Sequence, residues 1–188
     1  DITSAGAGNA GSLSITTENL EIADFSSISS IASKTGNAGS IEISADDILL
    51  NNYSEIATFT YFIPDKGKQA GNTAGSGGDL VLDVKTLKIT GNSGMELGTW
   101  GQGDSGSVTI RSDEVILEGS YINGDVYGDG AVDENFEENW QSVTGVGPFI
   151  SFETKNMSLG GASSIDLTST GAGDAGMLSI ETDFLELT

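Results

Sequence analysis

The sequence predicts an all-β fold, a parallel β-helix of about six coils with about 28 residues in each coil. The first observation is its spacing: a recurring phrase returns after 28, 39, 28, 42 and 28 residues, so two intervals equal 28 plus an insertion of 11 or 14. The second is that apolar and polar residues alternate after each phrase, which is typical of strands, whereas no window has helical periodicity. The phrase reads Gly-x-x-Gly-x-apolar-x-apolar, with Pro148 in place of the second glycine in the fifth copy, and begins at Gly8, Gly36, Gly75, Gly103, Gly145 and Gly173.

The first unit, residues 8–35, illustrates how one coil is expected to form. A glycine turn at its start precedes a first strand at 13–16, and the polar corner Thr17–Asn19 leads to a second strand around 20–22. A third strand is expected over Ser26–Ser33. The glycine that opens each phrase repeats at a corner, where we expect a positive φ. The residues expected to point inward are Leu13, Ile15, Leu20, Ile22 and Ile28.

Alignment of the units gives four inward columns in the first two strands, and all 24 positions are apolar. Such columns are expected when equivalent strands lie side by side and share one buried face. The columns are Leu13, Ile41, Leu80, Val108, Ile150, Leu178; Ile15, Ile43, Leu82, Ile110, Phe152, Ile180; Leu20, Ile48, Leu87, Val115, Met157, Leu185; and Ile22, Leu50, Ile89, Leu117, Leu159, Leu187.

The third strand is less regular. Its aligned inward residues are Ile28, Ile56, Met95 and Ile165. In the fourth unit Asn123 falls at this position, and Ile122 is adjacent to it. We therefore expect a one-residue slip or a bulge near Gly119.

The repeat favours a single domain over residues 1–188. Residues 1–22 and 166–187 are identical at 14 of 22 positions, so we interpret the chain as a slice of a longer array. Two insertions are expected, at about 62–75 and 128–144, and both fall between a third strand and the next glycine turn. They should leave the same edge of the molecule, two coils or about 10 Å apart.

Composition excludes several functions. The 188 residues include 7 Lys and Arg against 28 Asp and Glu, a net charge of −21, which disfavours nucleic acid and anionic lipid as partners. No apolar run reaches membrane-spanning length, so no direct membrane insertion is expected. The absence of Cys and His excludes a thiol nucleophile and a Ser–His triad.

The repeats resemble those of filamentous-haemagglutinin-type exoproteins, in the GNAGxLxI variant common in cyanobacterial members. The phrases that carry the resemblance are GNAGSLSITTENLEI, GNAGSIEISADDILL, GDSGSVTIRSDEVIL and GDAGMLSIETDFLEL, and together they extend along the whole chain. The resemblance implies a right-handed parallel β-helix, secreted by the two-partner route to the bacterial cell surface. It also implies a structural and adhesive shaft, not an enzyme, with a cell-surface glycan or protein, or neighbouring copies of itself, as partner. The family's secretion domain has no counterpart in these residues.

An enzyme remains the alternative, because parallel β-helices also host polysaccharide lyases and hydrolases. A lyase needs a basic residue, but Lys85, Lys155 and Arg111 each fall between acids of neighbouring coils. This arrangement predicts a cross-strand charge ladder. For a glycoside hydrolase a pair of carboxylates is required, and no pair stands out from the sequence.

The insertions and the strand ends beside them hold the candidate ligand site, because loops on one face of a solenoid commonly bind partners. The aromatic candidates are Tyr61, Phe62, Trp100, Tyr127, Phe136 and Trp140. Two rings with nearby acids suit a sugar, whereas the alternative is a lid in which the rings only pack over the core. No cofactor is expected except Ca²⁺, for which the acidic candidates are Asp125, Asp129, Asp133 and Glu134.

Overall fold

The computed structural model describes residues 1–33, 35–61, 75–100, 103–127, 144–170 and 172–188. All regular secondary structure in these residues is β-strand, and every strand pair is parallel. The prediction of an all-β fold is therefore confirmed. Within the same residues, no helix is long and apolar enough to cross a bilayer.

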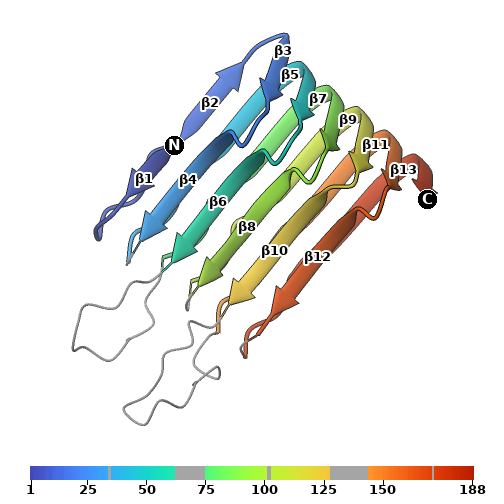
Figure 1. Ribbon diagram of the computed structural model, residues 1–188. Coiled ribbons are helices and arrows are strands. Elements are labelled where there is room, and N and C mark those ends of the chain that lie inside the picture. The colour runs from blue at the N-terminus through green and yellow to red at the C-terminus, as the bar shows by residue number, and fades with distance from the viewer. Residues whose placement is uncertain (34, 62–74, 101–102, 128–143, 171) are drawn as a thin grey trace.

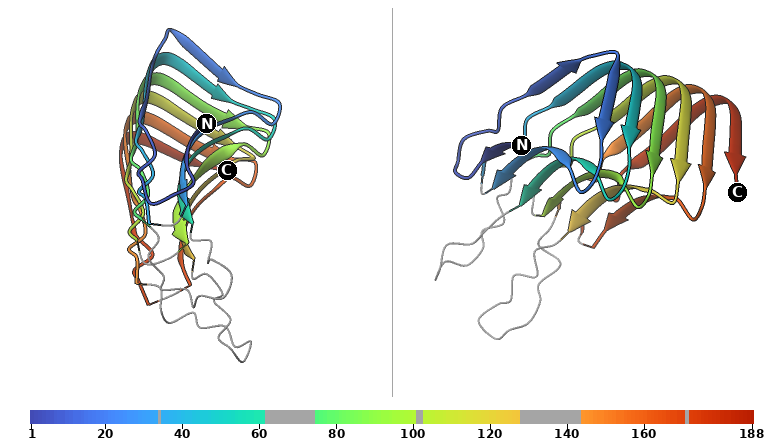
Figure 2. Two further views of the ribbon diagram at one scale, coloured as in Figure 1. Left: turned by 90° about the vertical axis from the view of Figure 1, so that its left-hand side faces the viewer. Right: turned by 45° about the horizontal axis from the view of Figure 1, so that its top comes forward.

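The strands form two parallel sheets whose members lie side by side in chain order, with the two termini at opposite ends of the row (Figures 1 and 2). Consecutive long segments of the chain alternate between the sheets, and the core lies between them. Sheet A contains β1 (Ile2–Ser4), β4 (Ser27–Ser33), β6 (Glu55–Tyr61), β8 (Gly94–Trp100), β10 (Tyr121–Tyr127) and β12 (Ser164–Ser169). Sheet B contains β2 (Leu13–Thr16), β3 (Asn19–Ile22), β5 (Ile41–Leu50), β7 (Leu80–Thr90), β9 (Val108–Glu118), β11 (Phe149–Gly160) and β13 (Met177–Leu187).

The register of sheet B follows the repeat. Leu13 pairs with Ile41, Ile41 with Leu80, and Leu80 with Val108, at intervals of 28, 39 and 28 residues. The other three predicted columns are in register in the same way. Their side chains are fully or nearly buried in the middle strands except at Leu159, and they become partly exposed in β2 and β13, which have a neighbour on one side only.

The first two strands predicted for each unit are separate only in the first unit, as β2 and β3. In the other units they form one long strand that bends, so the structure has two sheets where three rows of strands were expected. The bend falls near Lys85 and Lys155, where the pairing of equivalent residues is interrupted for one or two positions. The strand bends at these unpaired positions but does not end there, because its residues are paired with the neighbouring strand both before and after the bend.

The corner between sheet B and sheet A normally contains two successive residues with positive φ, as in Asn52 and Tyr53. In the fourth unit this corner has a single such residue, Gly119 with φ 55°. Ile122 consequently pairs with Met95 and Ile165 and is fully buried. The predicted slip is therefore real, and it is a corner shortened by one residue, not a bulge.

The reason predicted for the repeating glycines was wrong. Gly36, Gly75 and Gly173 do not have positive φ. A Cβ at any of them would instead overlap the carbonyl oxygen of the equivalent glycine in the preceding unit. Glycine is required here because stacked backbones approach closely.

Candidate functional site

Most of the candidate residues that the structure describes lie on the outward face of sheet A. Ile56, Met95 and Ile122 belong to the core, so the residues on either side of each point away from it. At the carboxyl ends of the strands, Tyr61 pairs with Trp100, and Trp100 pairs with Tyr127. Three of the six predicted aromatic residues therefore lie in one row across β6, β8 and β10.

Phe59 joins two of these rings into an aromatic cluster, defined here as Phe59, Tyr61 and Trp100. The Phe59 ring meets the Trp100 ring edge to face, with centroids 5.4 Å apart and an interplanar angle of 80°. It also contacts Tyr61 at 6.3 Å. Trp100 remains 45% exposed, so the cluster presents an indole surface to solvent. Such a surface can bind a partner through its ring face.

Two carboxyl groups lie on the same face, toward the amino-terminal ends of the strands. Glu55 and Glu96 are within hydrogen-bonding reach on neighbouring strands. Burial raises the pKa of Glu55, and the charge and hydrogen bond of Glu96 raise it further. Burial and then the charge of Asp125 raise the pKa of Glu96. The pair therefore holds a proton more readily than ordinary glutamates do.

Tyr121 lies next to this pair. Burial raises the pKa of its phenol, followed by the charges of Glu55 and Glu96. Its ring lies over Gly94, since a Cβ at Gly94 would fall 2.6 Å from two ring carbons. The glycine thus leaves room for the ring on the outer surface of the sheet.

Asp125 is the described member of the predicted Ca²⁺ site, and it is buried on β10, with 7% exposure. It faces Gly98 on β8 and Thr168 on β12. Among the residues that the structure describes, no group of three acidic side chains is arranged to hold a metal ion.

Several predicted site residues lie outside the described residues. They are the aromatic candidates Phe62, Phe136 and Trp140 and the acidic candidates Asp129, Asp133 and Glu134. The same applies to nearly all of the two predicted insertions, 62–75 and 128–144. The residues before them are described: Tyr61 and Tyr127 pair with Trp100 from either side, so the described chain reaches both insertions at one edge of sheet A, two strands apart.

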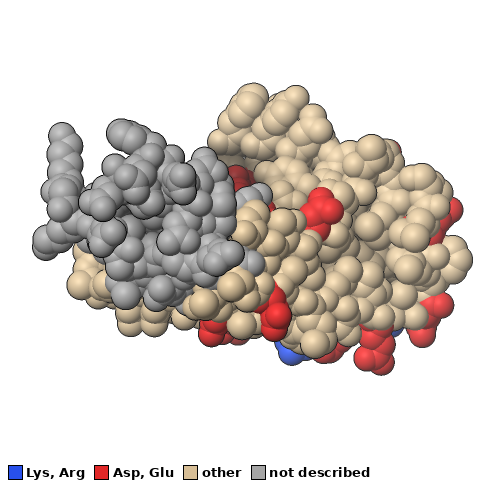
Figure 3. All heavy atoms as spheres, turned by 90° about the horizontal axis from the view of Figure 1, so that it is seen from below, with Lys and Arg blue, Asp and Glu red and all other residues tan. Residues whose placement is uncertain are grey.

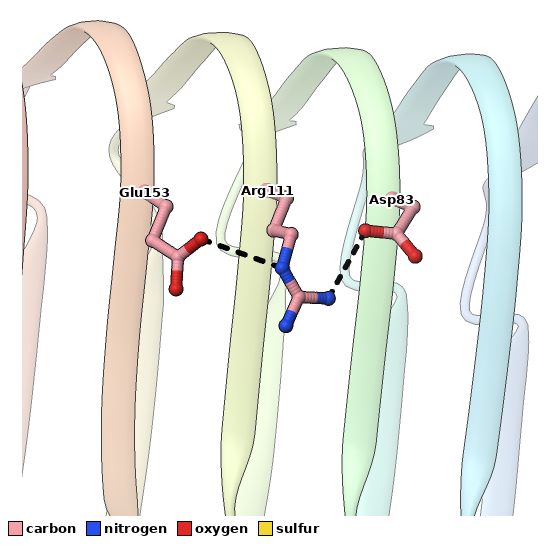
Figure 4. Close-up of polar contacts among 3 residues, drawn as sticks. All are labelled: Asp83, Arg111 and Glu153. Carbon is pink, nitrogen blue, oxygen red and sulfur yellow. Dashed lines mark hydrogen bonds and ion pairs between the residues drawn. The ribbon is translucent and has the colours of Figure 1, made fainter.

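The predicted charge ladder is present on sheet B, away from these residues. Arg111 lies between Asp83 at 3.2 Å and Glu153 at 3.4 Å (Figure 4). Lys85 contacts Asp46 at 2.8 Å and Lys155 contacts Asp113 at 2.6 Å, and these carboxylates raise the pKa of both lysines through a hydrogen bond and their charge. The ladder gives these basic residues a structural role.

The charge of the molecule is mainly acidic on the face seen in Figure 3, where few basic side chains are visible. On the outward face of sheet A, the described strands carry no Lys or Arg at all. A ligand at this face would therefore meet aromatic rings and carboxyl groups. An anionic ligand is disfavoured there.

Sequence analysis missed the Glu55 and Glu96 pair. The two residues are 41 positions apart, and their proximity depends on the register between β6 and β8 across an insertion. An alignment of the outward residues of the third strand places the two diagonally, with Glu55 opposite Gly94 and Glu96 opposite Ala57.

Comparisons of this chain with protein-family models, with curated protein sequences and with solved structures find no match.

Proposed function

We propose that this chain is a segment of a right-handed parallel β-helix that serves as a structural and adhesive shaft in a secreted bacterial surface exoprotein. The observation that carries the proposal is the in-register pairing of every sheet B strand with its equivalent one repeat unit later. A rod built in this way keeps the same cross-section along its length, which suits a shaft that holds contact sites away from a cell.

The stacked turns support the β-helix proposal further. Ala10 N donates to Asn37 O, Ala38 N to Ser76 O, and Gly77 N to Asp104 O. The backbone therefore continues its hydrogen bonding from unit to unit through the glycine turns as well as through the strands.

The adhesive part of the proposal rests on the aromatic cluster at the edge of sheet A. An exposed Trp100 backed by Phe59 and Tyr61 offers a rigid ring face, and Asp125, which pairs with Gly98, places a carboxyl group close to it. This combination suits a cell-surface glycan or a protein loop. An extracellular location and export by two-partner secretion belong to the same proposal.

A glycan-array experiment tests the adhesive role, with and without Ca²⁺. Trp100→Ala and Trp140→Ala should each reduce binding of the glycans that the native chain retains. Phe184→Ala is the control, because Phe184 is an exposed aromatic residue on β13, far from the cluster in the strand order. Binding that is unchanged in both tryptophan variants would refute the aromatic patch, and an effect of chelation would support a Ca²⁺-dependent contact.

A carbohydrate-active enzyme is the second candidate, favoured by the raised pKa values of Glu55 and Glu96. Paired carboxyls of this kind can supply a general acid. A hydrolase fits better than a lyase, because the described outward face of sheet A lacks a basic residue. Hydrogen-bonded carboxyls are closer than the roughly 5–9.5 Å that glycosidases use between acid and base or nucleophile, so Asp125 would have to act as the second group.

Release of reducing ends from neutral oligosaccharides separates the two candidates. Hydrolysis that is lost in Glu96→Gln and kept in Glu42→Gln would establish the enzyme. The adhesive shaft instead predicts binding with no turnover in the native chain.

A further inference from the structure

The corner between sheet B and sheet A carries a column of exposed residues that is interrupted at one place. The column consists of the second left-handed residue of each corner: Phe25, Tyr53, Asn92 and Ala162. Asn92 N, in the corner between β7 and β8, donates to Gly119 O in the corner between β9 and β10, just as Tyr53 N donates to Gly91 O one corner earlier. Gly119 therefore occupies the first position of its pair, and the residue that would continue the column is missing.

The missing residue leaves a notch in the corner. A cavity of about 230 Å³ lies here, between Asn92 on one side and Ala162 on the other, with Gly119 and Ser120 below. Asn92 and Ala162 precede β8 and β12, which flank β10 in sheet A, so they are two strand spacings or roughly 10 Å apart. We call this cavity the corner notch.

The lining of the corner notch is polar and carries no charged side chain. It offers the Asn92 amide, the Ser164 hydroxyl, Tyr121 and the backbone of two glycines. Among the described residues, the Asn92 side chain hydrogen-bonds to no other group, so its donor and acceptor are available. Neutral amide and hydroxyl groups suit a hydroxylated, uncharged ligand.

The surroundings disfavour an anion. The Glu118 carboxylate lies beside Gly161, which also lines the notch, and the whole chain carries a net charge of −21. Both would repel a sulfated or uronic acid chain.

An aromatic pair, called the platform here, lies in the same column on the side of Asn92 away from the notch. The Phe25 and Tyr53 rings stack with centroids 5.1 Å apart and an interplanar angle of 2°. Phe25 belongs to the preceding corner and so covers one face of the Tyr53 ring. Asn92 is the next residue of the column after Tyr53, and Tyr53 is 54% exposed. The electron-rich face of a phenol ring attracts the polarised C–H groups of a sugar ring.

We propose that the corner notch binds one or two rings of an uncharged oligosaccharide. One pyranose ring stacks on Tyr53 and receives hydrogen bonds from Asn92, and the next ring occupies the space above Gly119. The site lies at the amino-terminal ends of the sheet A strands. The aromatic cluster lies about 20 Å away at their carboxyl ends, so the two sites are independent.

Amide NMR titration of the whole 188-residue chain tests the proposal. The probes are cellotetraose, maltotetraose and chitotetraose as neutral oligosaccharides, with tetragalacturonate as the anionic comparison. We expect at least one neutral probe to shift the amide signals of Asn92, Ser120 and Gly161 most strongly. Tetragalacturonate should bind at least tenfold more weakly than that probe.

Two variants fill the notch by different routes. One carries an extra Asn between Gly119 and Ser120, which restores the corner length of the neighbouring units. The other is Ala162→Asn, which keeps a residue that tolerates positive φ and adds a side chain at the rim. Each should weaken binding at least tenfold, and thermal unfolding followed by circular dichroism checks that each variant is folded.

Tyr53→Ala tests the platform against Phe184→Ala, because Phe184 is similarly exposed at 57% but lies on β13. The first should lower affinity about tenfold and the second should leave it unchanged. The proposal is overturned if no neutral probe shifts these signals, if tetragalacturonate binds best, or if binding persists in both notch-filling variants. None of these outcomes bears on binding at Trp100, which the glycan array reports separately.

Discussion

Glu55 and Glu96 oppose the folded state at neutral pH. Both carboxyls are half-buried on adjacent strands, and the pKa of each is raised above the ordinary value of 4.5. The folded chain therefore binds these protons more tightly than the unfolded chain does. Stability from this pair is fully present below pH 4.5 and is lost as the pH rises through the raised pKa values.

Glu96→Gln should therefore stabilise the fold at pH 7, by about 0.2–1 kcal/mol, the usual range for a cross-strand pair. The gain should shrink as the pH approaches 4, where the native carboxyls are protonated. Urea unfolding at pH 4 and pH 7 measures both effects, and Glu42→Gln on sheet B is the exposed control. A gain of equal size at the two pH values would contradict the raised pKa of this pair.

The repeating glycines act by a different mechanism, since they leave space for the backbone of the neighbouring unit. Gly39→Ala places a methyl group against the Gly11 carbonyl oxygen and should cost about 1–3 kcal/mol of unfolding free energy. Gly6→Ala is the matched control, because a Cβ at Gly6 has no atom within 4 Å among the described residues. Thermal unfolding of the two variants should differ clearly, and equal melting temperatures would refute close backbone stacking.

Each long strand of sheet B changes direction at a bend and still continues as one strand. β5, β7, β9, β11 and β13 each join two alternating apolar segments across a bend that carries charged residues. From one strand to the next, the charges at the bend alternate in sign. The same is true of the neighbouring row, which consists of Asp83, Arg111 and Glu153. Exposed pairs of this kind add little energy, but they replace repulsion within columns that would otherwise be acidic.

Removal of the central charge tests that role. Arg111→Gln should lower the unfolding free energy by up to about 1 kcal/mol in low salt, and by less in 0.5 M NaCl, because ions screen exposed charges. Lys88→Gln is the control, since Lys88 forms no ion pair with the described residues. A loss that is independent of salt would point to packing of the Arg111 stem, not to its charge.

At the level of the whole molecule, the sequence predicted the strands and their register well, because apolar columns such as Ile43, Leu82 and Ile110 depend only on spacing. It did not predict the merging of two strands into one. A polar corner has the same sequence pattern whether the pairing between strands ends there or is only interrupted for one or two residues. The sequence also did not predict contacts between residues far apart in the chain. A Cβ at Gly124 on β10, for example, would overlap the ring of Pro148. The Glu55 and Glu96 pair was missed for the same reason, as it arises from register across an insertion.

The molecule exposes apolar side chains on its last strand, where β13 is paired on one edge only. Met177 and Leu187 are well exposed there. An open strand edge with apolar neighbours favours pairing with a second copy. The 188-residue chain should therefore self-associate as its concentration rises, and Met177→Lys should weaken this association at least threefold in analytical ultracentrifugation. A native chain that stays monomeric up to 0.5 mM would contradict this expectation.

The register of sheet B also sets how the protein can change in length. Leu80 meets Val108 and Ile150 meets Leu178 at the same 28-residue interval, so each block contacts only the blocks before and after it. Duplication or loss of one complete block would rejoin equivalent apolar surfaces and leave the remaining contacts intact. Recombination between such blocks can therefore lengthen or shorten the protein in fixed increments, while a deletion of another size inside a strand would misalign the columns of that strand.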